Sequence, residues 1–510
     1  MAWPDLGPAV LEILLGAGAR RELEPGEVLF EVGQDSYDLS YLLSGAVQII
    51  DRADDSVVVT IEAPNFLGEL GMLMGQGTFL AGVASERSEV VVVEQGKVLE
   101  LIATEPELSD VLVTAFAARR RLLIEWGEGG LTIVGSDTDA DCLRLREFAS
   151  RNRIPHRFVD RADRDALEAL AEVTEIPAAG TAVITGRNDV LSQPTTRDLA
   201  RVLGLELYVE KDEFYDMVVV GAGPAGLAAA VYGASEGLCT LVIEDTAIGG
   251  QAGTSSRIEN YLGFSTGVSG TELAYQGAIQ ALKFGARIAM PRRAVRLEPG
   301  AGGFEVELDD GSLLHTRTVV IAAGVQYRRL PLERLESFEG AGVYYAATHL
   351  EARFCTGRDA VIIGGGNSAG QAAMFLSRHA RRIHIVVRGP GLTATMSSYL
   401  SDRIHSDDRI RLWTETTVTE LHGDETLDGV TLRHGPTGDA TRLDVGALFI
   451  MIGAAPNTEW LRGVVDLDDN GFIETGHGGD PFVTSQPGVY AVGDIRSSSV
   501  KRVASAVGEG

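Results

Sequence analysis

The chain contains few cysteines, and no two of them are close in the sequence. Cys142, Cys239 and Cys355 are the only three among 510 residues, so no Cys-x-x-Cys motif exists. This excludes a disulfide framework and makes the cytoplasm the expected compartment. No apolar run approaches the roughly 18 residues needed to span a bilayer. Met1–Gly7 lacks the basic and apolar regions of a secretion signal.

Basic residues are scarce relative to acidic ones: 44 Lys and Arg face 72 Asp and Glu, a net charge of −28. Nucleic acids and anionic membranes bind clustered cations, so neither is an expected partner. An apolar content of 45% and a charged content of 23% are ordinary for a globular protein. A chain of 510 residues is too long to fold around a single hydrophobic core. About three or four domains are therefore expected.

The first 210 residues predict two domains of different class. Residues 1–129 predict a β-barrel with helices, and the expected strands are 28–30, 41–43, 47–50 and 57–61, followed by a helix at 98–126. Gly127-Glu128-Gly129-Gly130 predicts a linker. Residues 130–210 predict a small α/β domain, with strands at 131–134, 157–159 and 182–184 and helices at 140–151, 166–174 and 197–203. From residue 211, longer βαβ units predict two Rossmann-like α/β nucleotide-binding domains.

The first glycine-rich motif is Gly221-Ala222-Gly223-Pro224-Ala225-Gly226, between an apolar strand at 216–220 and a small-residue helix at 227–235. In such a motif the first glycine permits a tight turn, the second lets a pyrophosphate approach the backbone, and the third allows close helix packing. The helix N-terminus attracts the phosphate charge. The next strand, 240–243, ends in Glu244, which is placed to accept hydrogen bonds from ribose hydroxyls.

The second motif is Gly364-Gly365-Gly366-Asn367-Ser368-Ala369, between a strand at 360–363 and a helix at 370–378. The strand after it ends in Arg388, 24 residues beyond Gly364, whereas Glu244 lies 23 residues beyond Gly221. An acid suits a free ribose diol and an arginine can pair with a 2′-phosphate. The sequence therefore predicts FAD at the first motif and NADPH at the second. The alternative is that Arg388 is a solvated arginine, because no second basic residue accompanies it.

From Tyr215 onward the chain resembles low-molecular-weight thioredoxin reductases. The matching segments, in the family's order, are Gly249–Gln251, Ile258–Phe264, Ile321–Gly324, Ile452–Thr458 and Gly488–Asp494. The resemblance implies that Asp494 binds the ribityl chain of FAD and that Gln251 and Asn260 lie near the flavin. It also implies a homodimer, and an FAD domain at 211–327 and 448–510 split around an NAD(P)H domain at 328–447. Val507–Gly510 falls where the family's last helix begins.

These observations define the expected site. The residues expected at FAD are Gly221, Gly223, Pro224, Ala225, Gly226, Glu244, Gly250, Gln251, Asn260, Val295, Ala323, Gly324, Gly493 and Asp494. Those expected at NADPH are Gly364, Gly366, Asn367, Ser368, Ala369 and Arg388. No metal site is expected.

The redox-active cysteines of thioredoxin reductases are missing. In the family a Cys-x-x-Cys pair precedes the second glycine motif, and here Ala346 and His349 occupy those two positions. One histidine cannot replace a dithiol. The flavin is expected either to pass electrons to a small acceptor, a quinone, oxygen or a redox protein, or to meet thiols that a partner brings. His349 is a candidate proton donor or simply fills the vacated site, and Cys355 is expected to be a small buried hydrophobe.

The N-terminal domains resemble two further families. Pro25–Phe30, Tyr41–Gly45 and Phe66–Leu70 resemble a cyclic-nucleotide-binding domain, in which the last segment holds the ribose and a later arginine pairs with the cyclic phosphate. Gly68 and Glu69 are present, but the arginine position falls on Thr78 or Phe79. We therefore favour a degenerate domain that mediates contacts or binds another effector, over one that binds a cyclic nucleotide.

Residues 130–210 resemble a thioredoxin or glutaredoxin fold. Glu175-Ile176-Pro177 occupies the family's proline turn, but Gly135–Thr138 holds no dithiol, so the domain is expected to be a redox-silent spacer or docking element. The sequence as a whole predicts an FAD-dependent oxidoreductase that takes hydride from NADPH and passes electrons to an unidentified acceptor. The alternative is a flavin-based redox or effector sensor with little turnover.

Overall fold

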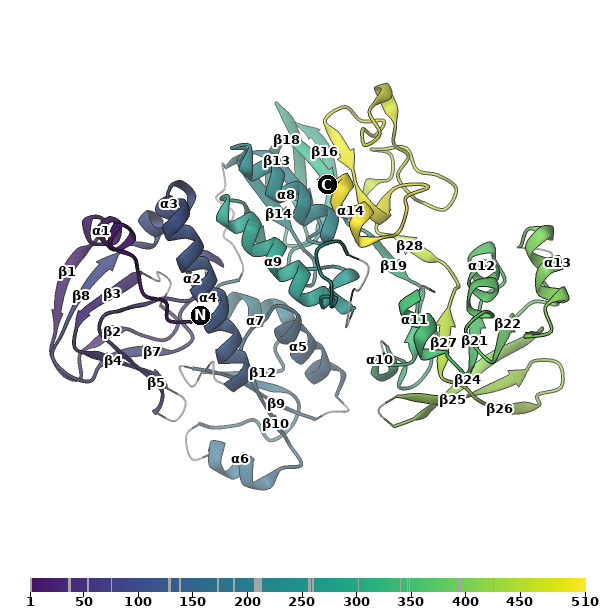
Figure 1. Cartoon of the computed structure of the whole chain (residues 1–510), viewed down its shortest axis with the longest axis horizontal. Coiled ribbons are helices and arrows are strands. Elements are labelled where there is room, and N and C mark those ends of the chain that lie inside the picture. Colours follow the sequence, from purple (N-terminus) through teal and green to yellow (C-terminus); the bar gives the residue numbers. More distant parts are fainter. Residues whose placement is uncertain are drawn as a thin grey trace. The chain divides into compact units, whose positions relative to one another are not determined.

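In the computed structural model the chain divides into two compact units, which Figure 1 shows with their elements labelled. The first comprises Met1–Thr254, Ser269–Gly324 and Thr458–Gly510, and the second Ser255–Val268 and Val325–Asn457. The structure describes residues 2–34, 38–52, 55–74, 76–126, 130–136, 139–171, 174–186, 189–205, 213–255, 258, 261–300, 302–339, 341–345, 347, 349–392, 396–424 and 426–510. Within these residues no helix has both the length and the apolarity to cross a membrane.

The N-terminal domain has two antiparallel four-stranded sheets. Their strand orders are β1-β8-β3-β6 and β2-β7-β4-β5. The strands are β1 (Ala19–Leu23), β2 (Val28–Phe30), β3 (Leu39–Ser44), β4 (Ala46–Asp51), β5 (Ser56–Glu62), β6 (Asn65–Leu67), β7 (Ala81–Ala84) and β8 (Ser88–Val93). The helices are α1 (Pro8–Ala17), α2 (Gly71–Met74), α3 (Gln95–Thr104) and α4 (Pro106–Trp126).

The predicted helix at 98–126 is wrong as a single element, because it is divided between α3 and α4. Pro106 has no N–H to continue a helix and a fixed φ that suits a first helical position, so α3 ends and α4 begins there. Leu108, Leu112 and Phe116 lie one helical turn apart on α4 and are fully buried. They share one hydrophobic cluster with Tyr275 and Ile279, which lie outside this domain in the sequence.

The small α/β domain has a four-stranded sheet of order β10-β9-β11-β12. Its elements are β9 (Leu131–Gly135), α5 (Ala140–Arg151), β10 (Arg157–Asp160), α6 (Arg164–Ala171), β11 (Ala182–Thr185), β12 (Val190–Ser192) and α7 (Thr196–Val202). β9 is parallel to β10 and antiparallel to β11. β9 and β11 are buried along their lengths, and most of their residues are apolar. Their core is continuous with that of the next domain.

The third part of the first unit contains the first glycine motif. Its sheet has the order β15-β14-β13-β18-β17-β16, and β29 pairs with β18. The elements are β13 (Phe214–Val220), α8 (Pro224–Ser235), β14 (Thr240–Ile243), a 3-10 turn (Ala252–Thr254), α9 (Gly270–Lys283), β15 (Arg287–Ala289), β16 (Ala294–Gly300), β17 (Gly303–Leu308), β18 (Leu313–Ile321), β29 (Val489–Ala491), a 3-10 turn (Gly493–Ile495) and α14 (Val503–Glu509). The parallel strands β13 and β14 are apolar and buried over Met217–Val220 and Leu241–Ile243, as strands covered on both faces require.

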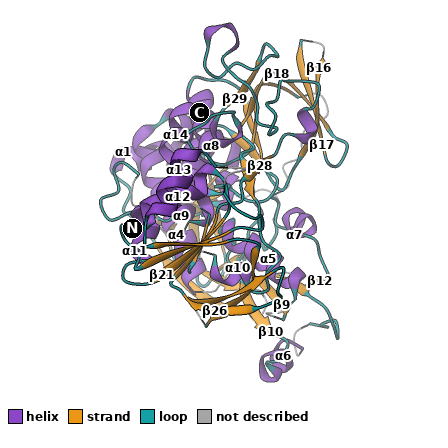
Figure 2. Ribbon diagram, turned by 90° about the vertical axis from the view of Figure 1, so that its right-hand side faces the viewer, coloured by secondary structure: helices purple, strands orange, loops and turns teal. Residues whose placement is uncertain are grey.

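The second unit contains a parallel sheet, β20-β27-β21-β22-β23, and an antiparallel sheet, β24-β25-β26; strands are orange in Figure 2. The elements are β19 (Val325–Tyr327), α10 (Leu335–Phe338), β20 (Val343–Tyr344), α11 (His349–Phe354), β21 (Asp359–Ile363), α12 (Asn367–Leu376), β22 (Arg382–Val386), α13 (Ser398–Ser406), β23 (Ile410–Trp413), β24 (Thr416–Gly423), β25 (Leu427–His434), β26 (Ala440–Asp444), β27 (Ala447–Ile450) and β28 (Ala454–Pro456). Because β27 pairs with β21, the strand at 447–450 lies in this sheet, and this part of the chain extends beyond the predicted boundary at 447.

Candidate functional site

The first glycine motif forms the turn between β13 and α8. Gly221 has a φ of +109°, and a Cβ there would lie 2.5 Å from the carbonyl oxygen of Ala322. A Cβ at Gly226 would lie 1.8 Å from the Gly221 carbonyl oxygen, so helix and strand approach as closely as the motif predicts. Gly223 caps the N-terminus of α8, and a Cβ there would meet nothing within 4 Å. The free space beside this helix N-terminus fits a pyrophosphate.

The segment that carries Gly250 packs against this turn. The Gly249 N–H donates to the carbonyl oxygen of Ala222 over 2.8 Å. A Cβ on Gly250 would lie 3.2 Å from the Cα of Gly223. The next residue, Gln251, is exposed, and its carbonyl oxygen accepts from the hydroxyl of Thr254. The structure thus brings Gly250 to the glycine turn, as expected of residues around one cofactor.

Glu244 follows β14 and is buried, and its carboxylate is held by the backbone. Its oxygens accept from the N–H groups of Ala222 (2.8 Å), Thr246 (2.9 Å) and Ala247 (3.2 Å). Burial raises the pKa of the Glu244 carboxyl, although these three N–H groups oppose the shift. The sequence predicted only a ribose contact, and the structure adds a second role, because Glu244 ties the glycine turn to the segment 246–250. The Oε2 oxygen, which accepts only from the Ala222 N–H, keeps acceptor capacity for a ribose hydroxyl.

Gly493 lies beside the first turn of α8, and Asp494 follows it in the chain. A Cβ on Gly493 would lie 2.9 Å from that of Ala225, so glycine is required for this approach. Asp494 is half-buried, and its carboxylate accepts no hydrogen bond from the residues that the structure describes. Burial raises its pKa, and the nearby Lys501 opposes the shift. A half-buried carboxylate of this kind fits a hydroxyl donor such as the ribityl chain of FAD.

The remaining expected FAD residues are only partly located. Ala323 and Gly324 follow β18, next to the Ala322 carbonyl that contacts Gly221. Val295 lies at the start of β16 and is 37% exposed. It comes shortly after Arg292, whose N–H donates to the Glu244 carbonyl oxygen over 2.7 Å. Asn260 lies outside the described residues.

The second glycine motif joins β21 to α12. Gly364 has a φ of +142°, and a Cβ there would lie 2.3 Å from the carbonyl oxygen of Met451. α12 begins at Asn367, with Gly366 as its N-cap, so the helix starts three residues before the predicted position. Asn367, Ser368 and Ala369 therefore form its first turn, where backbone N–H groups are free to bind phosphate. The Asn367 side-chain oxygen accepts from the Ser397 N–H over 2.8 Å.

Arg388 is exposed and makes no ion pair or hydrogen bond within the described part of the chain. The backbone on either side of it is fixed. The Val387 N–H donates to the Trp413 carbonyl oxygen, and the Glu415 N–H to that of Gly389, each over 2.9 Å. A guanidinium presented on a fixed backbone without a protein partner fits a 2′-phosphate.

The cysteines do not form a redox centre. None of Cys142, Cys239 and Cys355 is in a disulfide, and Cys142 and Cys355 are fully buried. Burial raises the pKa of the Cys355 thiol to about 12, so it is not a thiolate at neutral pH. His349 begins α11, but the position of its side chain, like Ala346 and Thr348, lies outside what the structure describes.

The segment of the N-terminal domain that resembles a phosphate cassette is closed by an internal ion pair. Glu69 is 8% exposed, and its carboxylate accepts two hydrogen bonds of 2.9 Å from the buried guanidinium of Arg120 on α4. The same guanidinium donates to the Gln76 side-chain oxygen (2.9 Å) and lies 5.0 Å from the centre of the Phe79 ring. The carboxylate expected to hold a ribose is thus already paired. The sequence shows Arg120 only as part of a basic run near the end of a helix.

Two glycine turns, each between a parallel strand and a helix and each in its own sheet, define a flavoprotein with a second dinucleotide site. Residues 215–510 match the pyridine nucleotide-disulphide oxidoreductase family, and the chain belongs to that family. Residues 20–105 match the cyclic nucleotide-binding domain. The protein is therefore an FAD-dependent NAD(P)H oxidoreductase of the thioredoxin reductase-like type, as the motifs predicted, and FAD and NADPH are the cofactors of that type.

Similar proteins cover the C-terminal part of the chain. A thioredoxin reductase of Mycolicibacterium smegmatis is 36% identical over 297 residues, which is 58% of this chain and 93% of that protein. An NADH dehydrogenase of Bacillus subtilis is 30% identical over 362 residues, 70% of this chain and 68% of that protein. The crystal structure of thioredoxin reductase from Streptococcus pyogenes aligns with a TM-score of 0.54 and 31% identity, covering 58% of this chain and 94% of that one.

Proposed function

We propose that this protein takes hydride from NADPH and passes the electrons through FAD to an acceptor that lies outside the chain. FAD accepts two electrons from a reduced nicotinamide and releases them to an acceptor. The observation that supports the proposal is the state of the cysteines. A chain with three separate thiols, two of them fully buried, has no dithiol with which to relay electrons to a disulfide substrate.

The roles of the chain's own residues follow from the two turns. The N-terminus of α8 and the space at Gly223 would hold the FAD pyrophosphate. Glu244 would accept from the ribose, and Asp494 from the ribityl chain. In the second unit, the first turn of α12 would hold the NADPH pyrophosphate and Arg388 the 2′-phosphate.

A variant without cysteines tests the proposal. Cys142→Ala, Cys239→Ser and Cys355→Ala together are expected to leave the flavin absorbance and the rate of NADPH oxidation with a quinone, oxygen or a redox protein within about twofold of the parent, because no thiolate takes part. Alkylation of the parent protein is expected to have the same small effect. A colourless purified protein, or loss of all acceptor-dependent turnover with the cysteines, contradicts the proposal.

A sensor with little turnover is a second candidate function, and the buried pair of Glu69 and Arg120 favours it, because a closed cassette suits a regulatory domain. Rapid mixing with NADPH distinguishes the two. An enzyme shows flavin reduction followed by reoxidation when an acceptor is added. A sensor shows reduction that quinones, oxygen and redox proteins fail to reverse.

We further infer that residues 130–210 form a thioredoxin-like domain without redox activity. The order of elements β9, α5, β10, α6, β11, β12, α7 and the sheet order β10-β9-β11-β12 support this. Cys142 lies within α5 and is fully buried. A buried thiol is inert toward disulfides, so thiol labelling of the folded protein is expected to leave Cys142 unmodified.

A further inference from the structure

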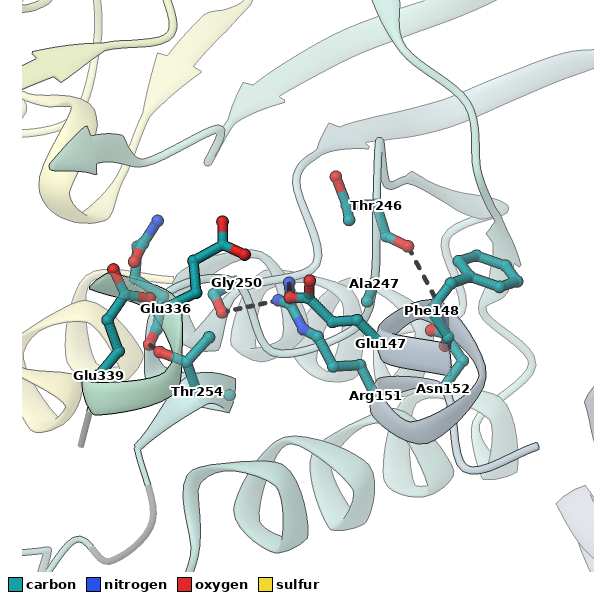
Figure 3. Close-up of polar contacts among 12 residues, drawn as sticks. Glu147, Phe148, Arg151, Asn152, Thr246, Ala247, Gly250, Thr254, Glu336 and Glu339 are labelled. Carbon is teal, nitrogen blue, oxygen red and sulfur yellow. Dashed lines mark hydrogen bonds and ion pairs between the residues drawn. The ribbon is translucent and has the colours of Figure 1, made fainter. Parts of the chain in front are cut away.

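The end of helix α5 in the small α/β domain is hydrogen-bonded to the segment that leads to Gly250. Figure 3 shows the Arg151 guanidinium donating to the Gly250 carbonyl oxygen over 3.1 Å. The side-chain amide of Asn152 donates to the Thr246 carbonyl oxygen over 3.4 Å. Arg151 is only 20% exposed, so its hydrogen bond is partly shielded from water. The segment 246–250 is therefore held from one side by Glu244 and from the other by α5.

The same helix end is held by the N-terminal domain. The Arg120 guanidinium, which pairs with Glu69, also donates to the Arg153 carbonyl oxygen over 3.3 Å. Arg153 has a φ of +52°, a conformation that needs support from its surroundings. That support comes from α9, because the Arg153 guanidinium pairs with Glu272 and lies 4.5 Å from the centre of the Tyr275 ring. A continuous set of contacts thus runs from Glu69 through Arg120 and the turn 151–153 to Gly250.

The junction that these contacts cross is buried and polar. Arg151, Asn152 and Tyr275 line a cavity of about 10 Å³ together with Met74 of α2 and Ile248. The Arg151 Nε, the Asn152 Oδ1 and the Tyr275 hydroxyl are buried there without a hydrogen-bond partner among the described residues. A small displacement of the junction can change how many of these buried polar atoms are hydrogen-bonded.

We infer that Arg151 is a positioning residue for the loop Gly249–Thr254, and that the ion pair of Glu69 and Arg120 holds Arg151 in place. The occupancy of the N-terminal cassette then sets the reactivity of the flavin. An anion or other ligand that withdraws Arg120 from Glu69 also withdraws the donor from the Arg153 carbonyl and loosens the loop. This inference rests on the proposed flavin site, because Gly250 and Gln251 act on the flavin only if they contact it.

The first test compares Arg151→Ala with Arg144→Ala in the full-length holoenzyme. Arg144 lies on the same helix, but it pairs with Asp141 at the surface. Arg151→Ala is expected to accelerate amide hydrogen exchange in 246–254 by about tenfold, as the loss of one charge-assisted hydrogen bond implies. It is also expected to shift the flavin potential and lower kcat without changing KM for NADPH. Arg151→Lys is expected to restore part of each effect, since lysine still donates.

The second test addresses the N-terminal link. Glu69→Gln removes the negative charge that pairs with Arg120 and is expected to accelerate exchange in 246–254 in the same direction as Arg151→Ala. If this variant unfolds the N-terminal domain, Glu69→Asp keeps the charge, shortens the side chain and supplies the same comparison. Equal exchange in Arg151→Ala and Arg144→Ala overturns the positioning role, and unchanged exchange in both Glu69 variants overturns the link.

The two proposals fail in different ways. A protein that binds no FAD contradicts the proposed function, yet the exchange of 246–254 still reports whether Arg151 and Glu69 control the loop. A flavoprotein whose potential and loop exchange are the same in Arg151→Ala and in the parent contradicts only the inference.

Discussion

Arg388 is the residue that we propose selects the nicotinamide nucleotide at the second site. It is exposed, follows the end of β22, and has no partner among the described residues. A free guanidinium that meets a 2′-phosphate gains a charge-assisted, bidentate contact. Arg388→Ala is therefore expected to raise KM for NADPH by roughly 10- to 100-fold and to leave KM for NADH within about twofold. Steady-state kinetics with both nucleotides measure this.

The matched control is Arg382→Ala, at the opposite, exposed end of the same strand. It is expected to leave both constants unchanged, because it lies away from the turn that holds the nucleotide. Equal losses for NADPH and NADH in Arg388→Ala would show that the arginine supports the fold and does not select the nucleotide.

In the glycine turn between β13 and α8, one glycine is expected to be needed for stability and another for FAD binding. Gly221→Ala places a Cβ 2.5 Å from a carbonyl oxygen at a positive φ and is expected to destabilise the domain by about 2–3 kcal/mol. Gly223→Ala meets nothing within 4 Å and has an ordinary φ, so the apoprotein is expected to keep its stability. Its methyl group would occupy the space for the pyrophosphate, and FAD binding is expected to be lost.

Thermal unfolding and FAD titration of the two apoproteins measure the difference. Gly237→Ala, at a turn beyond α8 with open space around it, serves as a control for the cost of a positive φ alone. Retention of FAD by Gly223→Ala would place the pyrophosphate elsewhere.

The strands β21, β22 and β23 are joined by a buried histidine. The His384 Nδ1 accepts from the Trp413 indole N–H, and its Nε2 lies 3.1 Å from Asp359 Oδ2. Burial lowers the pKa of His384 below its ordinary 6.5, although Asp359 opposes the shift. Above pH 6.5 both folded and unfolded forms are neutral, and the histidine adds no pH dependence. As the pH falls below 6.5, His384 is protonated in the unfolded chain but stays neutral in the folded chain, so the stability of the folded state falls.

His384→Gln is expected to remove this loss, so its stability changes less than that of the parent between pH 6.5 and pH 5. Denaturant unfolding at several pH values measures it. His405→Gln, on the exposed face of α13, is the control and is expected to follow the parent. Parallel pH curves for His384→Gln and the parent would mean that His384 is protonated in the fold.

The sequence predicted some of these elements and missed others, depending on how far apart in the sequence the interacting segments lie. The strands and helices around both glycine motifs were placed within a few residues, because buried parallel strands and small-residue helices leave strong local patterns. β1, β6, β7, β8, β12 and α1 were not predicted. Of these, β1, β6, β7 and β8 pair with segments distant in the sequence, so their pairing leaves no local pattern. Arg120 could not be assigned a partner, because Glu69 lies 51 residues away and only the fold brings them together. The backbone contacts of Glu244 were missed because they depend on the turn geometry.

At the scale of the whole molecule, one hydrophobic cluster of the first unit is shared by three domains. Phe79 of the N-terminal domain, Ile133 of the small α/β domain and Val219 of the FAD domain belong to a single hydrophobic cluster. Several ion pairs between these domains involve α9. Lys283 pairs with Asp110 over 3.0 Å, and Glu272 pairs with Arg121 of α4 and Arg153 of the small domain. We therefore expect the three domains to unfold together.

Glu272→Ala tests this cooperativity. The carboxylate is 26% exposed, so its two ion pairs are partly buried and their loss is expected to cost on the order of 1–2 kcal/mol. Burial acts to raise the pKa of Glu272, but Gln276 and Arg153 lower it overall, so its contribution is present above its ordinary 4.5 and is lost as the pH falls further. Calorimetry at neutral pH is expected to show a broadened or split transition for Glu272→Ala and a single one for Glu236→Ala, an exposed control at the end of α8.

At acid pH the stability of the parent is expected to approach that of Glu272→Ala, since protonated Glu272 no longer pairs with either arginine. A sharp single transition for Glu272→Ala at neutral pH would show that the apolar core alone couples the domains.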